Sequence, residues 1–157
     1  MSDPGAPPAP PPRYVHGLFC DQVRDEVGGT QTYVGVYGPQ LTLAFPPPFL
    51  VATLAAVTWV VAPIDDQIGN MAMRLHLPDG QVMEVGQDIP PPHFLPVTPE
   101  SRQRIAAVVL RINNLMIQQA GRLWLEVIVD GTSWVGANLR ITVQAAGTLI
   151  QAVSSSS

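Results

Sequence analysis

The chain has 157 residues, a mass of 16.8 kDa and a formal net charge of −4 at pH 7. It is 46% hydrophobic but only 13% charged, about half the charged fraction that is usual for a globular domain, which favours a large buried core or an apolar surface for a partner. Its eight basic residues are all arginines, which excludes a lysine nucleophile, and they are scattered, which argues against nucleic-acid binding. It has one cysteine, which excludes a disulfide framework and a multi-cysteine zinc site.

The chain begins and ends with low-complexity segments. Residues 1–13 are rich in proline and alanine, so we expect a disordered or polyproline-II-like tail that acts as a spacer. Residues 151–157 form a serine-rich tail, which leaves 14–150 as one domain. Neither a signal peptide nor an apolar run of about 20 residues is present, so a cytoplasmic protein without a membrane span is expected.

The domain opens with a predicted β-hairpin. Residues 14–24 and 30–38 alternate apolar side chains with polar or small ones, and the glycines of 26–29 supply the turn. Pro39 interrupts the second strand, which resumes over 41–45.

The middle of the chain predicts a buried strand and a second hairpin. Residues 50–62 are the most apolar segment, and their Val and Thr content between prolines favours a central strand buried on both faces over a helix. Residues 71–85 alternate on both sides of the turn Pro-Asp-Gly at 78–80. The Pro-rich connection over 86–101 is expected to lack regular structure.

The last third completes the sheet pattern. Residues 102–117 fit a strand better than the alternative, an Arg/Ala-rich helix. Residues 118–144 form a strong hairpin with its turn at Asp130-Gly131. Seven to eight strands with no confident helix predict an all-β fold, an antiparallel β-sandwich of immunoglobulin-like arrangement.

Cys20 is the first residue to consider as a catalytic group. A nucleophilic cysteine needs a neighbour that stabilises the thiolate, but the adjacent Asp21 has the opposite effect. His16 lies four residues away, about 13 Å along an extended strand, and cannot reach the thiol within that strand. We therefore interpret Cys20 as a half-buried structural residue.

A cluster of acids invites a calcium interpretation. Asp21, Asp25 and Glu26 lie on the first hairpin, with Asp65 and Asp66 as candidates from another loop. Because Ca²⁺ takes six to eight oxygen ligands, the hairpin supplies only part of a site. Solvated pairs with Arg24 are the favoured interpretation, and no metal site is predicted.

The remaining motifs of enzymes are missing. The three histidines share no metal-binding spacing, no serine lies in a nucleophile elbow, and no phosphate-binding glycine loop follows a strand. We expect no enzyme activity, no catalytic residue and no cofactor.

The first hairpin resembles a family of uncharacterised bacterial proteins whose signature reads roughly F-C-D-x-x-R-x-E-x-x-G-K, followed by G-[VI]-Y. Matching positions are Phe19, Cys20, Asp21, Arg24, Glu26, Gly29, Val34, Gly35, Val36 and Tyr37, with Thr30 in place of the lysine. The hairpin at 121–131 is also similar to that family. The resemblance implies an immunoglobulin-like or C2-like sandwich and marks Cys20, Asp21, Arg24, Glu26, Gly35 and Tyr37 as a signature cluster.

These observations predict a non-enzymatic β-sandwich that serves in interaction or assembly, with a protein partner or as a homo-oligomer. One alternative is a surface or structural protein of a phage or particle. Another is an enzyme or accessory subunit that uses Cys20 together with a histidine from a distant strand.

Overall fold

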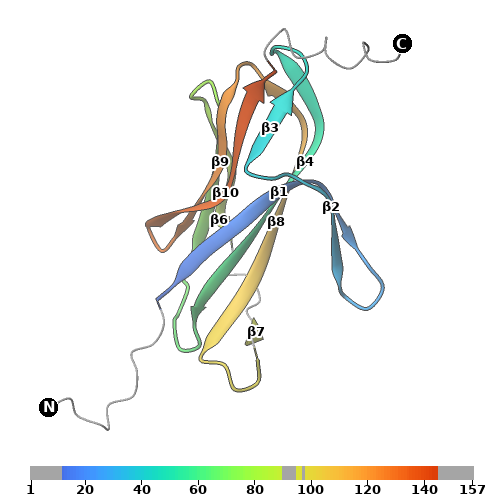
Figure 1. The fold of residues 1–157 in the computed structure, drawn as a ribbon. Helices are drawn as coiled ribbons and strands as arrows, with labels where there is room; N and C mark the ends of the chain where they lie inside the picture. Colours follow the sequence, from blue (N-terminus) through green and yellow to red (C-terminus); the bar gives the residue numbers. More distant parts are fainter. Residues whose placement is uncertain (1–11, 90–94, 97, 145–157) are drawn as a thin grey trace, which may run out of the picture.

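The computed structural model describes residues 12–89, 95–96 and 98–144, which form ten β-strands in two sheets (Figure 1). Sheet A has the order β2 (Gln31–Val36), β1 (Tyr14–Asp25), β4 (Phe49–Pro63), β8 (Gln103–Ile117) and β7 (Leu95–Pro96). Sheet B has the order β3 (Gln40–Leu43), β10 (Thr132–Val143), β9 (Gly121–Val129), β5 (Met71–His76) and β6 (Val82–Ile89). No described segment is a helix long and apolar enough to cross a bilayer.

The strand connections are those of an immunoglobulin-like sandwich. Strands β1, β4, β8 and β7 stand in the order A, B, E, D of that fold, and β5, β9 and β10 stand in the order C, F, G. All pairings are antiparallel except that of β3 with β10, which is parallel. The predicted all-β sandwich is therefore confirmed, with the immunoglobulin-like order rather than a C2-like one.

The core lies between the sheets and follows from alternating side chains. In β9 the residues at 123, 125, 127 and 129 are buried, and their neighbours are partly exposed. The opposite wall comes from β4, where 54–58 and 60–62 are buried, because this central strand is covered on both faces. The expected central strand over 50–62 is confirmed.

Ten strands form instead of the seven to eight expected, for two reasons. Pro39 does not merely interrupt a strand: it begins the segment that leaves sheet A and pairs in parallel with β10 as β3. The Pro-rich connection over 86–101 is not wholly irregular, since β6 extends to Ile89 and β7 pairs with β8. Edge strands tolerate proline because one row of their amides needs no partner.

The other local predictions have mixed outcomes. Residues 102–117 are a strand, as favoured, and the turns at 78–80 and 130–131 join the expected strand pairs. Arg13, assigned to the tail, is bound to the sandwich through ion pairs with Asp66 at 2.8 Å and Asp130 at 3.0 Å. The rest of the predicted N-terminal tail (1–11), the end of the predicted domain (145–150) and the predicted serine-rich tail (151–157) lie outside the described residues.

The two sheets touch closely where β1 crosses β10. A Cβ atom on Gly17 would lie 2.5 Å from the Val57 carbonyl oxygen and 3.0 Å from the Gly136 carbonyl group. Gly136 lies in an irregular part of β10, between Val135 and Asn138, where the register with β9 shifts. Glycine is required at this crossing because backbone atoms of two strands occupy the space of a side chain.

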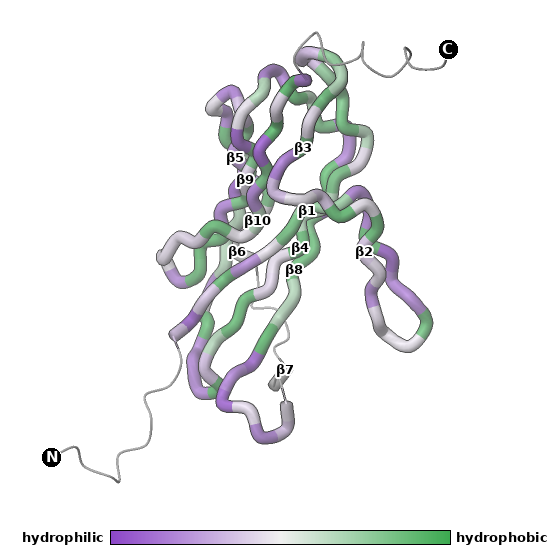
Figure 2. Tube along the Cα trace, viewed as in Figure 1, coloured by the Kyte–Doolittle hydropathy of each residue, from purple (hydrophilic) through white to green (hydrophobic). Residues whose placement is uncertain are grey.

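Sheet A divides into two arms after the pair Cys20–Ala55. Residues 14–20 of β1 pair with residues 55–61 of β4. After Cys20, β1 pairs only with β2, and the part of β4 that precedes Ala55 pairs only with β8. The β1–β2 hairpin therefore diverges from the body of the sandwich (Figure 1). Figure 2 shows that the hairpin is largely hydrophilic, whereas β4 and β8 are mostly hydrophobic. We call the divergence between these arms the fork of sheet A.

In the arm of the fork that β4 and β8 form, the alternation of inward and outward side chains reverses once. Asn114 in β8 has a left-handed φ of 56°, a conformation in which asparagine is enriched. Ile112 faces the core before it, and Leu115 faces the core after it, so the alternation reverses at this point. As a result Leu50 and Met116, which are direct cross-strand partners, are 54% and 44% exposed.

Candidate functional site

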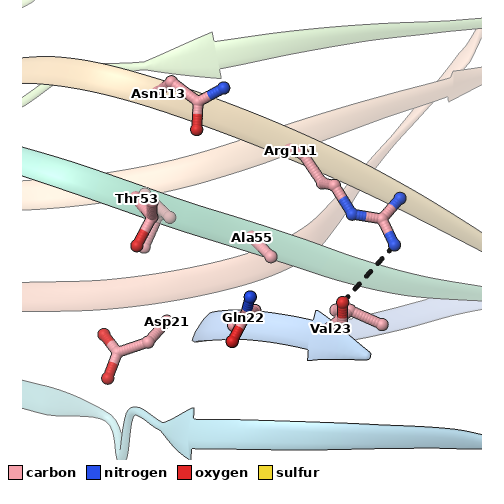
Figure 3. A pocket seen from close by; sticks show the side chains of 8 residues that line it. Asp21, Gln22, Val23, Thr53, Ala55, Arg111 and Asn113 are labelled. Atoms are coloured by element: carbon pink, nitrogen blue, oxygen red, sulfur yellow. Dashed lines mark hydrogen bonds between the residues drawn. The ribbon is translucent and has the colours of Figure 1, made fainter. Parts of the chain in front are cut away.

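A small groove lies in the fork of sheet A (Figure 3). Its volume is about 130 Å³. The lining residues come from β1, β4 and β8: Asp21, Gln22, Val23, Thr53, Leu54, Ala55, Arg111 and Asn113. Figure 3 shows Asp21 and Gln22 on β1, with Thr53 on β4 and Arg111 and Asn113 on β8 beyond it.

The groove carries donors on one side and acceptors on the other. Arg111 donates from Nη2 to the Val23 carbonyl oxygen at 3.5 Å, the long end of the hydrogen-bond range, and lies 3.4 Å from an Asp25 carboxylate oxygen. Asp25 and Arg111 are both exposed, so this ion pair contributes about 0–1 kcal/mol. These weak contacts leave the Arg111 guanidinium able to exchange its partners for those of a ligand.

A second, smaller apolar cluster on the outer face of sheet A holds the hairpin in place. Cys20 and Val23 from the hairpin are buried against Ala55 and Val57. Tyr33 packs edge-on against Trp59 with ring centroids 5.8 Å apart, and Trp59 also stacks on His16 with ring centroids 5.2 Å apart. The root of the hairpin is thus fixed, which keeps the fork open in one geometry.

Four members of the signature cluster meet at this root. The Tyr37 hydroxyl donates to Asp21, and the Tyr37 amide donates to the Phe19 carbonyl at 2.9 Å. Gly35 has a φ of +64°, and a Cβ atom on it would lie 2.0 Å from the Asp21 carboxylate. Glycine therefore makes room for the Asp21 side chain, and burial followed by the hydrogen bond to Asp21 raises the pKa of Tyr37 to about 12.

Cys20 is fully buried in this arrangement. Its thiol donates to the Gln22 carbonyl oxygen at 3.6 Å. Burial, and then the negative charge of Asp21, raise the pKa of the thiol above its ordinary value, whereas a nucleophile needs a lowered one. His16 stacks on Trp59 and Tyr14 instead of approaching the sulfur.

The other signature residues do not join the cluster. Arg24 is exposed and donates to the Gln22 side chain at 3.2 Å. Glu26 is exposed in the turn, where its backbone closes the hairpin by bonding to Thr30. The structure thus separates the cluster into a structural group, Cys20, Asp21, Gly35 and Tyr37, and two solvated side chains.

The calcium candidates are distributed over two ends of β1. Asp21, Asp25 and Glu26 belong to the hairpin, while Asp65 and Asp66 follow β4 near the start of β1, roughly 23 Å away at the usual rise of a strand. Asp66 is bound to Arg13. Across the residues that the structure describes, no three His, Cys, Asp or Glu side chains are grouped to hold a metal.

Sequence reasoning missed the residues that complete the groove. Thr53, Arg111 and Asn113 lie about 30 to 90 residues after the groove residues of β1 and reach them only through the register of β4 with β8. The exposed pair Leu50–Met116 was missed because the reversal at Asn114 breaks the expected alternation.

A Ser, His and Glu group on the outer face of sheet B resembles a catalytic triad in composition but not in geometry. Glu126 accepts from Ser133 and contacts His76 Nε2 at 2.9 Å, so the carboxylate lies between the other two. A triad needs the histidine to contact the serine directly. Ser133, and then His76, lower the pKa of Glu126, as expected for a structural carboxylate.

The comparison with protein families confirms the expectation of a family without an assigned function. The model of a family of unknown function (DUF6941) matches residues 16–142, a span that includes the whole fork and nearly all of both sheets. No curated protein matches the chain.

Proposed function

The chain belongs to this family of unknown function (DUF6941), so we propose a role from the surface of the protein itself. We propose that the protein is a non-enzymatic β-sandwich that binds an extended segment of a protein partner in the fork of sheet A. The observation that carries this proposal is the pair of strand edges that face each other across the fork, with no strand of the described residues between them.

The open edge of β4 is the principal contact surface. Residues 49–54 of β4 pair with β8 on one side, and the described chain supplies no strand on the other side. An open edge presents amide and carbonyl groups that an added strand can pair with, as in recognition by β-strand addition. The hairpin root blocks the sheet below Ala55, so the incoming segment would end at the groove.

Side chains around the edge provide specificity for such a segment. Leu50 and Met116 are exposed beside the open edge of β4. Together they offer an apolar surface that a side chain of the bound segment can contact. At the lower end, Asp21 can accept from a backbone amide, while Arg111 and Asn113 can donate to carbonyl groups. A neutral, extended peptide with one apolar side chain matches this combination.

The non-enzymatic part of the proposal is supported by the state of Cys20, the residue on which the alternative enzyme hypothesis rests. The thiol is buried, it has no histidine neighbour in the described structure, and its pKa is raised. Fast stoichiometric labelling of native protein by a mild thiol reagent near pH 7 would contradict this part.

Partner capture with matched variants tests the binding proposal. Leu50→Lys places a charge beside the open edge, a substitution that natural sheets use to prevent strand addition. Val82→Lys is the control, because Val82 is similarly exposed (48%) but lies on β6 of the other sheet. We expect proteins captured by the wild type to be lost with Leu50→Lys and retained with Val82→Lys, as measured by quantitative mass spectrometry.

Two results would contradict the proposal. One is capture that Leu50→Lys and Arg111→Gln leave unchanged. The other is light scattering that shows a stable dimer which Leu50→Lys converts to a monomer, since the fork would then accept a second copy of this chain and not a different protein.

A further inference from the structure

Two arginines lie directly opposite each other on the outer face of sheet B. Arg122 of β9 and Arg140 of β10 are cross-strand partners, and both side chains are exposed. Like charges directly opposite each other destabilise a strand pair. The arrangement is notable in a chain with a net charge of −4 and only eight basic residues.

The carboxylates on this face are engaged elsewhere. Glu84 pairs with Arg74 at 2.8 Å, and Glu126 accepts from His76 and Ser133. Asp79, in the turn near the start of β9, accepts from the Gln81 amide at 3.0 Å. Within the described ranges, no ion pair joins a carboxylate to Arg122 or Arg140.

The two guanidinium groups differ in how they are held. Arg122 donates from Nε to the Asn138 side-chain oxygen at 2.7 Å, and its guanidinium lies 5.1 Å from the centre of the Trp124 ring. Trp124 is itself held by stacking on His76 at 3.8 Å. These contacts fix the orientation of the Arg122 guanidinium before any ligand binds. Among the described residues, neither Nη group of Arg122 has a hydrogen-bond or ion-pair partner, and the Arg140 side chain has none either.

A hollow lies over the pair. Its volume is about 390 Å³, and it is lined by Gly121, Arg122, Asn138 and Arg140. The hollow is open to solvent. Gly121 at its edge has a φ of +148°, which other residues rarely adopt, and a Cβ atom there would lie 3.1 Å from the Pro78 side chain. The hollow holds many times the roughly 30 Å³ that one water molecule occupies in the liquid.

We propose that Arg122 and Arg140 form a binding site for a doubly charged oxyanion of the phosphate class. Two guanidinium groups without a carboxylate leave a local charge that a dianion neutralises, and each offers forked N–H donors that match phosphate oxygens. The bound anion would also remove the repulsion between the paired arginines. This site is on the sheet opposite the fork and is independent of the function proposed above.

Titration followed by amide and arginine NMR signals tests the site, with inorganic phosphate, sulfate and acetate at matched ionic strength. We expect saturable shifts at Gly121, Arg140 and the Arg122 Nε–H for the two dianions. Acetate should bind at least about tenfold more weakly, because it has one charge and fewer oxygens. A phosphoserine peptide distinguishes the source: tighter binding than inorganic phosphate indicates a phosphorylated protein, and equal binding indicates a free phosphate ion.

Matched variants decide the assignment. Arg140→Gln and Arg122→Gln should weaken phosphate binding at least about tenfold, whereas Arg24→Gln, which removes the same charge from the hairpin, should leave it unchanged. Arg140→Gln should also unfold at an equal or higher temperature than the wild type in dilute chloride, yet gain less from phosphate. Linear shifts that all variants share, or acetate that binds as well as phosphate, would overturn the proposal.

Discussion

Replacing Gly35 by alanine should destabilise the protein through the Asp21 side chain rather than through its own packing. Gly35 has a φ of +64°, and a Cβ atom there would lie 2.0 Å from Asp21 Oδ2 and 2.6 Å from its Cγ. Both contacts are shorter than any that real Cβ atoms make. The carboxylate must therefore move and release the Tyr37 hydroxyl, which donates to it.

Two terms set the size of the effect. A left-handed conformation costs an alanine about 1–2 kcal/mol relative to glycine. Loss of the exposed Tyr37–Asp21 hydrogen bond costs about 1 kcal/mol, the central value for hydrogen bonds in proteins, because solvent screens the charge of Asp21. Gly35→Ala should thus lower the free energy of unfolding by about 2–3 kcal/mol. Gly28→Ala, with a φ of +94° and open space around it, should cost only the first term.

Urea denaturation at pH 7, followed by tryptophan fluorescence, measures both variants. The decisive comparison is Gly35→Ala in an Asp21→Ala background, where the clashing carboxylate is gone and a single 3.0 Å contact with the Cβ atom of residue 21 remains. We expect the cost of Gly35→Ala to fall to about 1–2 kcal/mol there, a coupling of about 1 kcal/mol. Strictly additive effects of the two substitutions would refute the reasoning.

Three further predictions follow from the packing and the ionisation of the sandwich. Thr58→Val should be neutral or stabilise the protein by about 1 kcal/mol in the same urea assay, because the buried Thr58 hydroxyl has no hydrogen-bond partner in the described structure; a loss above 1 kcal/mol would contradict this. Gly17→Ala should lower the free energy of unfolding by about 1–3 kcal/mol, since its Cβ atom would lie 2.5 Å from the backbone oxygen of Val57. Gly38→Ala is the control, because its Cβ atom would lie in open space, and it should lower the free energy of unfolding by less than about 0.5 kcal/mol. The pKa of Tyr37 is about 12 in the folded protein and about 10 in the unfolded chain. As the pH rises from about 10 to 12, the unfolded chain therefore loses the Tyr37 proton before the folded protein does, and the free energy of unfolding should fall over this range. Partial exposure limits the fall to about 1 kcal/mol, and an equal fall in Tyr37→Phe would count against the assignment.

Local features of the fold could be predicted from the sequence, because they depend on neighbours along the chain. The Asp130-Gly131 turn and the alternation of β9 gave the final hairpin, and valine and threonine content identified β4. The transfer of β3 to the other sheet could not be predicted, because its parallel pairing with β10 joins residues about 100 positions apart.

The candidate site shows the same division. The pattern in the first hairpin marked Cys20, Asp21, Gly35 and Tyr37 together, and these four do meet. Arg24 and Glu26 carry the same pattern but are solvated, because strand alternation and the turn direct them away from the sheet.

The functional surfaces depend on register, which periodicity alone does not determine. Arg111 approaches the hairpin because it pairs with Ala55 across β4 and β8. Arg122 and Arg140 become opposite each other only after the register shift in β10 between Val135 and Asn138. A one-residue change in either register would turn these side chains to the other face of the sheet.

The central claim, that a partner segment adds a strand in the fork, is tested most directly by amide hydrogen exchange of β4. Exchange over residues 49–54 is measured in the free protein and in complex with a captured partner, with β9 as the internal reference. The account predicts exchange slowed at least about tenfold in 49–54 and unchanged in β9, since new backbone hydrogen bonds would form only in the fork. Unchanged exchange in 49–54 together with protection elsewhere would contradict it.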